Sequence, residues 1–251
     1  MKQASLDRRW FRFSVVAAAA ALIAAGAGLI QNPPPTPVEQ EQSVKPGINE
    51  RWKSDEIDPL VALLEAEGRA IYEQRDQLAA LAGPRKGSVV ADIGAGSGFM
   101  AEIFAQLVGP DGKVYAVDIN ALLMKRLAQD AAARGLTNLE VVVCGEREVN
   151  LPPASIDLMF ICDTYHHFEY PVSTMKSIHE SLKPGGQIVL VDFYRIEGVT
   201  PQWLMDHVRA GEEVFTQEII DAGFELINQH YPPKLPLNYV LRFRRIERGA
   251  E

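Results

Sequence analysis

The chain has 251 residues, of which 47% are hydrophobic and 23% are charged, and this fits a globular domain of moderate size with additional segments. The formal net charge of -8 argues against a nucleic-acid partner, because phosphate binding needs a basic surface. The short basic run RFRRIER at 242–248 alternates charged and apolar residues. This alternation predicts an edge strand near the carboxyl end and not a phosphate-binding patch.

The first 31 residues have the pattern of a targeting segment. Basic residues precede an apolar stretch at 14–30, and a small-residue A-x-A pattern lies at 25–27. This predicts a cleaved signal peptide or a retained membrane anchor at 1–31. Either one places the rest of the chain outside the cytoplasm, exported or anchored, with membrane contact only through residues 14–30. The Pro-rich residues 32–50 are expected to form an extended linker before a folded domain at 51–251.

The body of the chain alternates short β-like runs with helical ones. Helical periodicity over 57–81 predicts one or two helices before the sheet, and residues 224–229 and 239–245 can form an antiparallel hairpin at its end. This order is typical of a parallel, doubly wound α/β sheet. Strands are expected at 88–93, 113–119, 139–143, 155–162 and 187–193, and helices at 98–108, 121–135, 171–182 and 212–222.

A glycine-rich loop follows the first strand. The sequence VVADIGAGSG places Gly94, Gly96 and Gly98 before a helix, where glycines let the backbone approach a ligand at the carboxyl end of a strand. Asp118 ends the next strand, and a carboxylate there can accept both hydroxyls of a ribose. The two features together favour a nucleoside ligand over a plain tight turn. The G-x-G-x-G spacing and Phe99 depart from the nicotinamide-binding fingerprint.

Four motifs in this order carry a family resemblance: VVADIGAGSG, VYAVDI, LPPASIDLMFICDTYHHF and SLKPGGQIVLVDF. Through them residues 85–195 resemble the class I S-adenosylmethionine-dependent methyltransferases, and within these the UbiE-like small-molecule enzymes of the type 11 group. The resemblance implies a Rossmann-like seven-stranded sheet in the order 3-2-1-4-5-7-6 with helices on both faces. In that order Cys144 and Cys162 would lie about 14 Å apart, so free thiols are expected.

The resemblance also implies S-adenosyl-L-methionine as cofactor and a set of residues that bind it. Asp92 would orient the glycine loop, Asp118 would hold the ribose, and Asp163 would face the methionyl or sulfonium region. The other cofactor-binding positions are Gly94, Ala95, Gly96 and Gly98 under the methionyl part, Ile119 on the adenine face and Glu146 near the adenine edge.

The stretch CDTYHHF leaves the fourth strand beside the glycine loop and holds the candidate catalytic residues Tyr165, His166 and His167. A histidine with a pKa near neutrality can deprotonate an attacking hydroxyl or thiol. The alternative is that at least one of these side chains packs against the sheet. His207 could join both histidines around a metal ion, but adjacent histidines are expected to point in different directions, and no metal site is predicted.

Two further pairs are candidates for ligand contact. His207 and Arg209 could reach the acceptor, or they could lie on an exposed helix face. Tyr72 and Arg75 could reach the cofactor carboxylate, or they could form a surface pair.

The sequence therefore predicts methyl transfer from S-adenosyl-L-methionine to a small-molecule acceptor through an O, C, N or S atom. A non-catalytic cofactor-binding module is the main alternative, because the methyl donor is made in the cytoplasm. An NAD(P)-dependent oxidoreductase is disfavoured by the loop spacing.

Overall fold

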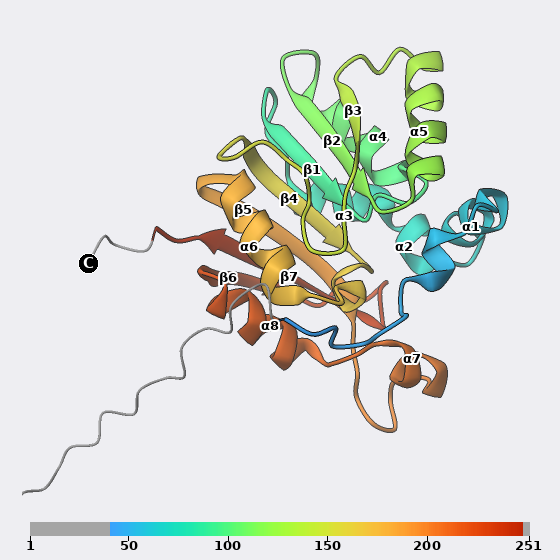
Figure 1. The fold of residues 1–251 in the computed structure, drawn as a ribbon, viewed down its shortest axis with the longest axis vertical. Coiled ribbons are helices and arrows are strands. Elements are labelled where there is room, and N and C mark those ends of the chain that lie inside the picture. Colours follow the sequence, from blue (N-terminus) through green and yellow to red (C-terminus); the bar gives the residue numbers. More distant parts are fainter. Residues whose placement is uncertain (1–40, 248–251) are drawn as a thin grey trace, which may run out of the picture. The chain divides into compact units, whose positions relative to one another are not determined.

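The computed structural model describes residues 41–247, which form a seven-stranded sheet in the predicted order β3-β2-β1-β4-β5-β7-β6 (Figure 1). The strands β1 to β5 pair in parallel, and β7 runs antiparallel to β5 and β6. Cys144 and Cys162 are free thiols on either side of β2 and β1. The bounds are β1 (Val89–Ile93), β2 (Lys113–Asp118), β3 (Leu139–Val143), β4 (Ile156–Cys162), β5 (Leu182–Phe193), β6 (Phe224–His230) and β7 (Asn238–Arg245).

Helices cover both faces of the sheet, because successive side chains of a strand point to opposite faces. Val90 belongs to a core with α3, α4 and α5, whereas Ala91 belongs to a core with α6, α7 and α8. The helices are α1 (Ile57–Leu64), α2 (Ala70–Glu73), α3 (Arg75–Ala82), α4 (Phe99–Val108), α5 (Ala121–Ala133), α6 (Pro171–Ser181), α7 (Gln202–His207) and α8 (Glu212–Asp221), with short 3-10 turns η2 (Glu50–Lys53) and η3 (Tyr165–His167).

The predicted targeting segment at 1–31 lies outside the described residues, and so does the first part of the predicted linker. Within 41–247, no helix has both the length and the apolar character that a bilayer crossing requires.

Strand β7 is an interior strand, so the prediction of an edge strand at 242–248 is wrong. It lies between β5 and β6, and β6 forms the edge. Arg242 is accommodated there because its guanidinium donates to Gln187 Oε1 at 2.6 Å and to the carbonyls of Leu81 and Ala82 at 2.6 and 2.9 Å. Those carbonyls end α3, where helical acceptors need a partner.

Residues 41–53, here called the N-terminal strap, pack against the domain (Figure 1). The structure thus differs from the expected linker, whose last ten residues belong to the strap. The Glu41 carboxylate accepts the backbone N–H groups of Val172 and Ser173 at 2.8 and 2.9 Å. These groups lie at the start of α6, where a negative side chain satisfies free donors and complements the helix dipole.

Candidate active site

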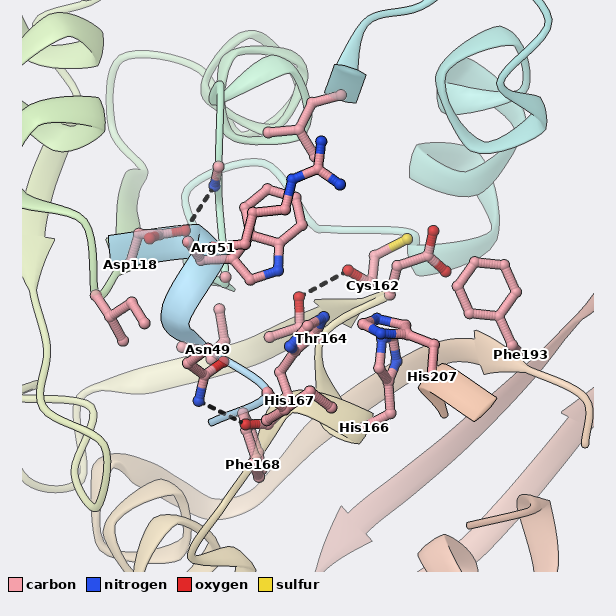
Figure 2. Close-up of a pocket in the computed structure, with 18 of the residues that line it drawn as sticks. Asn49, Arg51, Asp118, Cys162, Thr164, His166, His167, Phe168, Phe193 and His207 are labelled. Carbon is pink, nitrogen blue, oxygen red and sulfur yellow. Dashed lines mark hydrogen bonds between the residues drawn. The ribbon is translucent and has the colours of Figure 1, made fainter. Parts of the chain in front are cut away.

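A cavity of about 1010 Å³ lies at the carboxyl edge of the parallel strands. Small-ligand sites range up to roughly 1,000 Å³, so this volume is enough for a nucleoside-sized ligand together with a small second molecule. Its walls come from the glycine loop, the ends of β2, β3 and β4, the strap, the α1–α2 connection and α7. Figure 2 shows part of this wall, with strap residues Asn49 and Arg51 among the labelled side chains.

Gly94 and Gly96 form the floor of the cavity beside β1. Both have positive φ angles, 74° and 55°, which favour glycine. A Cβ atom added to Gly94 would lie 2.3 Å from Thr164 Oγ1, and one added to Gly96 would lie 2.7 Å from Leu64 Cδ1. A side chain at either position would have to displace a neighbouring protein side chain, and both glycines line the cavity with backbone alone.

Asp118 joins the end of β2 to the glycine loop. Its Oδ2 accepts the backbone N–H of Gly96 at 2.9 Å (Figure 2). Its Oδ1 accepts the backbone N–H of Asn120 at 2.9 Å. Each carboxylate oxygen can accept a further hydrogen bond, so the side chain still has capacity for a ligand hydroxyl. Burial raises the pKa of Asp118, while these backbone donors lower it.

Asp92 lies behind the loop and does not line the cavity. Among the described residues its Oδ2 has no hydrogen-bond partner. Burial, together with the nearby charge of Asp118, raises the pKa of Asp92 to about 7, and the Ala101 N–H opposes this shift. Asp92 therefore lies in the core near Asp118 and the start of α4, and its expected role in orienting the loop stays a prediction.

Two more acidic side chains line the cavity. Glu146 pairs with Lys53 of the strap at 2.6 Å. Asp163, at the tip of β4, pairs with Arg69 at 3.0 Å and accepts Asn238 Nδ2 at 3.0 Å. Burial raises the pKa of Asp163 to about 6, against the opposing effect of Arg69. Both carboxylates are thus ion-paired, and their oxygens remain hydrogen-bond acceptors in the cavity wall.

Three histidines, here called the histidine cluster, meet at the other end of the cavity: His166, His167 and His207 (Figure 2). Their ring centroids lie 4.3 Å apart for 166–167 and 5.1 Å apart for the two pairs with His207. The expectation that adjacent histidines diverge is wrong, because the 3-10 turn η3 turns both rings toward α7.

His166 is held from behind by Asp192 at the end of β5. Its Nδ1 lies 2.8 Å from Asp192 Oδ1, and its backbone N–H donates to Oδ2 at 3.1 Å. Asp192 is fully buried. Because the carboxylate accepts a hydrogen bond from Nδ1–H, the neutral ring presents the lone pair of Nε2.

His167 and His207 are held in their neutral forms. Burial lowers the pKa of His167 to about 2, and the charges of His166, His207 and Lys45 act in the same direction. Burial also lowers the pKa of His207. His167 Nδ1 is buried and has no partner in the described part of the chain.

The structure brings most of the predicted site residues to one cavity. Tyr165 is the clearest correction, because it is fully buried and donates to Glu218 Oε2 at 3.1 Å in the core beside Phe215. It is not available to an acceptor as predicted, since η3 directs it to the opposite side from the histidines. The predicted residues that line the cavity are Gly94, Gly96, Asp118, Ile119, Glu146, Asp163, His166 and His167, and those that do not line it are Asp92, Ala95, Gly98 and Tyr165.

Of the two further pairs, only His207 lines the cavity. Arg209 is buried in a two-bond pair with Glu218, at 2.8 and 2.6 Å. Arg75 lies over the ring of Tyr72, 4.5 Å from its centroid, and both line a separate small pocket.

Sequence reasoning missed Arg69, Asp192 and the strap. Arg69 lines the cavity where Tyr72 and Arg75 were expected, one turn earlier in the chain. Asp192 could have been predicted from the sequence, because an acidic residue inside the apolar run QIVLVDF needs a buried hydrogen-bond partner. The strap carried no such signal, because the hydrogen bonds that hold it to the domain are made with residues 68 to 162 positions away.

The fold and the cavity together define a Rossmann-like class I methyltransferase sheet with its ligand site at the carboxyl edge of the strands. A family model described as a methyltransferase domain matches residues 84–234. The chain belongs to this family of methyltransferase domains.

Two curated relatives are named ubiquinone/menaquinone biosynthesis C-methyltransferase UbiE. The one from Pseudomonas putida is 32% identical over 114 residues, which are 45% of this chain and 44% of the relative. The one from Cupriavidus taiwanensis is 27% identical over 117 residues, which are 47% of this chain and 48% of the relative. The chain thus spans about half the length of the curated relatives it matches.

Solved structures show the same fold. A SAM-dependent methyltransferase from Aquifex aeolicus superposes with a TM-score of 0.66 at 20% identity, covering 77% of this chain and all of that one. The [4+2]-cyclase SpnF superposes with a TM-score of 0.64 at 16% identity, covering 82% of this chain and 97% of that one. At these identities the likeness shows the fold alone.

The residues at the loop end of the cavity fit S-adenosyl-L-methionine, the cofactor of such domains. Gly94 and Gly96 line the cavity without side chains, so their backbone can lie directly against a ligand. Asp118 has spare acceptor capacity for ribose hydroxyls. Glu146 and Asp163 add hydrogen-bond acceptors at this end, each paired with a cationic side chain, Lys53 and Arg69.

Proposed function

We propose that the protein transfers a methyl group from S-adenosyl-L-methionine to a small-molecule nucleophile. The observation that carries this proposal is one continuous cavity with two chemically different ends. The glycine loop and Asp118 lie at one end, and the histidine cluster lies at the other. When bound, S-adenosyl-L-methionine supplies a methyl group made electrophilic by its sulfonium.

At the loop end, the residues would bind and orient the cofactor. Asp118 would accept the ribose hydroxyls, and Gly94 and Gly96 would let the methionyl part lie against the backbone. Ile119 offers an apolar contact for the adenine, with Glu146 at its edge. The charge of Asp163 is balanced by Arg69, so this pair can orient polar groups without adding a net charge.

At the histidine end, the residues would position the acceptor. His166 presents the Nε2 lone pair toward the cavity because Asp192 holds its Nδ1. A neutral imidazole held in this way can accept a proton from an acceptor hydroxyl or thiol. Trp52 and Ile48 of the strap line the cavity as well and would help to exclude water.

Calorimetry tests the cofactor part of the proposal. The purified protein should bind S-adenosyl-L-methionine and its demethylated product, S-adenosyl-homocysteine, in a saturable manner, and NAD weakly or not at all. Tighter binding of NAD would support the oxidoreductase alternative and would overturn the proposal.

Methyl transfer needs its own test, because SpnF has this fold and is named a cyclase. The protein would be incubated with donor labelled in the methyl group and with panels of phenols, thiols, quinols and amines. Label in any one acceptor supports the enzyme. Cofactor binding without transfer to any acceptor supports a non-catalytic binding module.

We also propose that the domain acts outside the cytoplasm, exported or anchored. The support is the sequence of residues 1–31, with its basic start and apolar stretch. Cell fractionation and mass spectrometry of the mature amino terminus test this. Recovery of the uncleaved chain in the cytoplasm would contradict it.

A further inference from the structure

The histidine cluster has the geometry of an ion-binding site. One ring nitrogen of each histidine lies within 4.8 Å of the other two. Nitrogen ligands of one tetrahedral zinc ion lie about 3.3 Å apart, given metal–nitrogen bonds of about 2.0–2.1 Å. Modest side-chain rotations of His166, His167 and His207 therefore suffice to bring three nitrogens onto one ion.

The surroundings supply the support that metal-binding histidines need. A ligating imidazole commonly donates its other N–H to a carboxylate, which fixes the tautomer and the ring orientation. Asp192 does this for His166, at 2.8 Å and with no exposure to solvent. The three ring nitrogens are thus close together, and one of the rings, His166, is already held in a fixed orientation.

His167 provides the second, independent observation. Its Nδ1 is buried and has no hydrogen-bond partner among residues 41–247, and His167 lines the cavity together with His166 and His207. A buried nitrogen without a partner costs free energy, so such atoms call for a physical explanation. A bound cation would supply the missing partner.

We propose that the histidine cluster binds a divalent transition-metal ion, with Zn²⁺ as the representative, and leaves one coordination position open toward the cavity. Three imidazoles favour zinc and its neighbours over magnesium or calcium, which prefer oxygen ligands. Three protein ligands with an open position are typical of catalytic sites, whereas structural zinc sites use four protein ligands.

The charges around the cluster are mixed. Lys45 Nζ donates to the carbonyls of Asp206 and His207, both at 2.6 Å, and opposes a second positive charge. The Asp192 carboxylate acts in the other direction and is in direct contact with the cluster. Metal affinity should therefore depend on Asp192 as well as on the three ligands.

The open coordination position indicates which class of acceptor the site would bind. This inference rests on the proposed function. A thiol or an acidic hydroxyl binds such an ion as its anion, releasing its proton to solvent. The ion would then generate the nucleophile beside the methyl donor in place of His166, whose Nε2 lone pair would bind the ion. We therefore assign thiols and acidic hydroxyls, including phenols and enols, as the acceptor class.

Metal binding is tested directly on the purified full chain after chelator treatment. Titration with Zn²⁺ should show one equivalent bound, and Co²⁺ should give the intense visible bands of a four-coordinate site. His207→Gln should weaken Zn²⁺ binding by at least about 100-fold and remove the Co²⁺ bands, since it removes a ligand. Asp192→Asn should weaken binding by about 10- to 100-fold.

The matched control is His230→Gln, which changes a histidine on β6, outside the cavity lining. It should bind Zn²⁺ with unchanged affinity. Circular dichroism and S-adenosyl-homocysteine binding in the metal-free variants check that each one folds. A folded wild-type protein without stoichiometric Zn²⁺, or equal loss in H230Q and H207Q, overturns the metal site. Cofactor binding retained in that case leaves the proposed function standing.

Discussion

The Oδ2 atom of Asp118 lies 2.9 Å from the backbone nitrogen of Gly96, so the acid at the end of β2 and the loop after β1 form one unit. Asn120 extends this unit, because it donates its N–H to Oδ1 and caps α5 through its own side chain. The residue expected to hold the ribose therefore also holds the backbone on which the cofactor would lie.

Replacing Asp118 should weaken cofactor binding more than it weakens the fold. Asp118→Ala removes a charged acceptor, and hydrogen bonds to charged groups contribute about 1.5–3 kcal/mol each. We expect the Kd for S-adenosyl-homocysteine, measured by calorimetry, to rise at least about 10-fold. Asp111→Ala, at an exposed turn position, is the control and should leave the Kd unchanged. Unchanged affinity in D118A would contradict the assigned ribose site.

A comparison of Gly94 with Gly135 separates the stability cost of a Cβ collision from the cost of a positive φ angle. Their φ angles are 74° and 72°, but a Cβ atom on Gly135 would meet no atom within 4 Å. Gly135→Ala should cost about 1 kcal/mol of unfolding free energy, and Gly94→Ala should cost about 1–3 kcal/mol more because of overpacking. Chemical denaturation measures both.

A second-site change checks the cause of that excess. Thr164→Ala removes Oγ1 and Cγ2, the two atoms that a Cβ on Gly94 would meet at 2.3 and 2.4 Å, but leaves the Thr164 Cβ at 2.9 Å. The double variant G94A/T164A should therefore recover part of the lost stability. Strictly additive effects of the two changes would show that the collision is not the cause.

Asp92 should make stability depend on pH. Its folded pKa of about 7 lies above the ordinary value of 3.8, so the protonated form is favoured by folding. The resulting stability is complete below about pH 4 and is lost as the pH rises to about 7. Asp92→Asn removes this loss, which amounts to at most about 4 kcal/mol at about 1.36 kcal/mol per pKa unit.

We therefore expect D92N to unfold at a higher temperature than the wild type at pH 8, and to differ little from it at pH 4. Thermal unfolding at both values measures this. Asp111→Asn serves as the exposed control with an unchanged profile. A lower melting temperature for D92N at pH 8 would mean that the ionised carboxylate stabilises the loop.

Glu41 should stabilise the domain from a distance. Removing its carboxylate leaves the N–H groups of Val172 and Ser173 without their partner, and losing a helix cap costs about 1 kcal/mol. For a domain of this size, Glu41→Ala should lower Tm by about 2–4 °C. Glu67→Ala, on an exposed connection, should not. Equal melting of the two variants would show that the strap contact contributes nothing.

The sequence predicted the sheet well because each of its signals is local. Alternating apolar runs define the strands, and the glycine loop and Asp118 lie at adjacent strand ends once the order is known. The edge prediction for β7 failed because charge alternation does not reveal that Arg242 reaches the end of α3.

The candidate site was less predictable, because one turn of 3-10 helix decides which side chain faces which way. Tyr165 enters the core, while His166 and His167 face the cavity. His207 joins them from a helix 40 residues later in the chain, and Asp192 supports them from β5. No local sequence pattern predicts these contacts, because they depend on tertiary packing.

The strap makes hydrogen bonds on both sides of the cavity, to a residue after β2 and to α7. Asn120, after β2, donates to the Trp52 carbonyl at 2.8 Å, and Lys45 reaches the carbonyl of His207 on α7 at 2.6 Å. Because Trp52 and Lys45 also line the cavity, occupancy of the cavity and seating of this segment are thermodynamically linked. Proteolytic cleavage within 41–53 should therefore slow when ligand is added, and the degree of protection would report affinity without any knowledge of the acceptor.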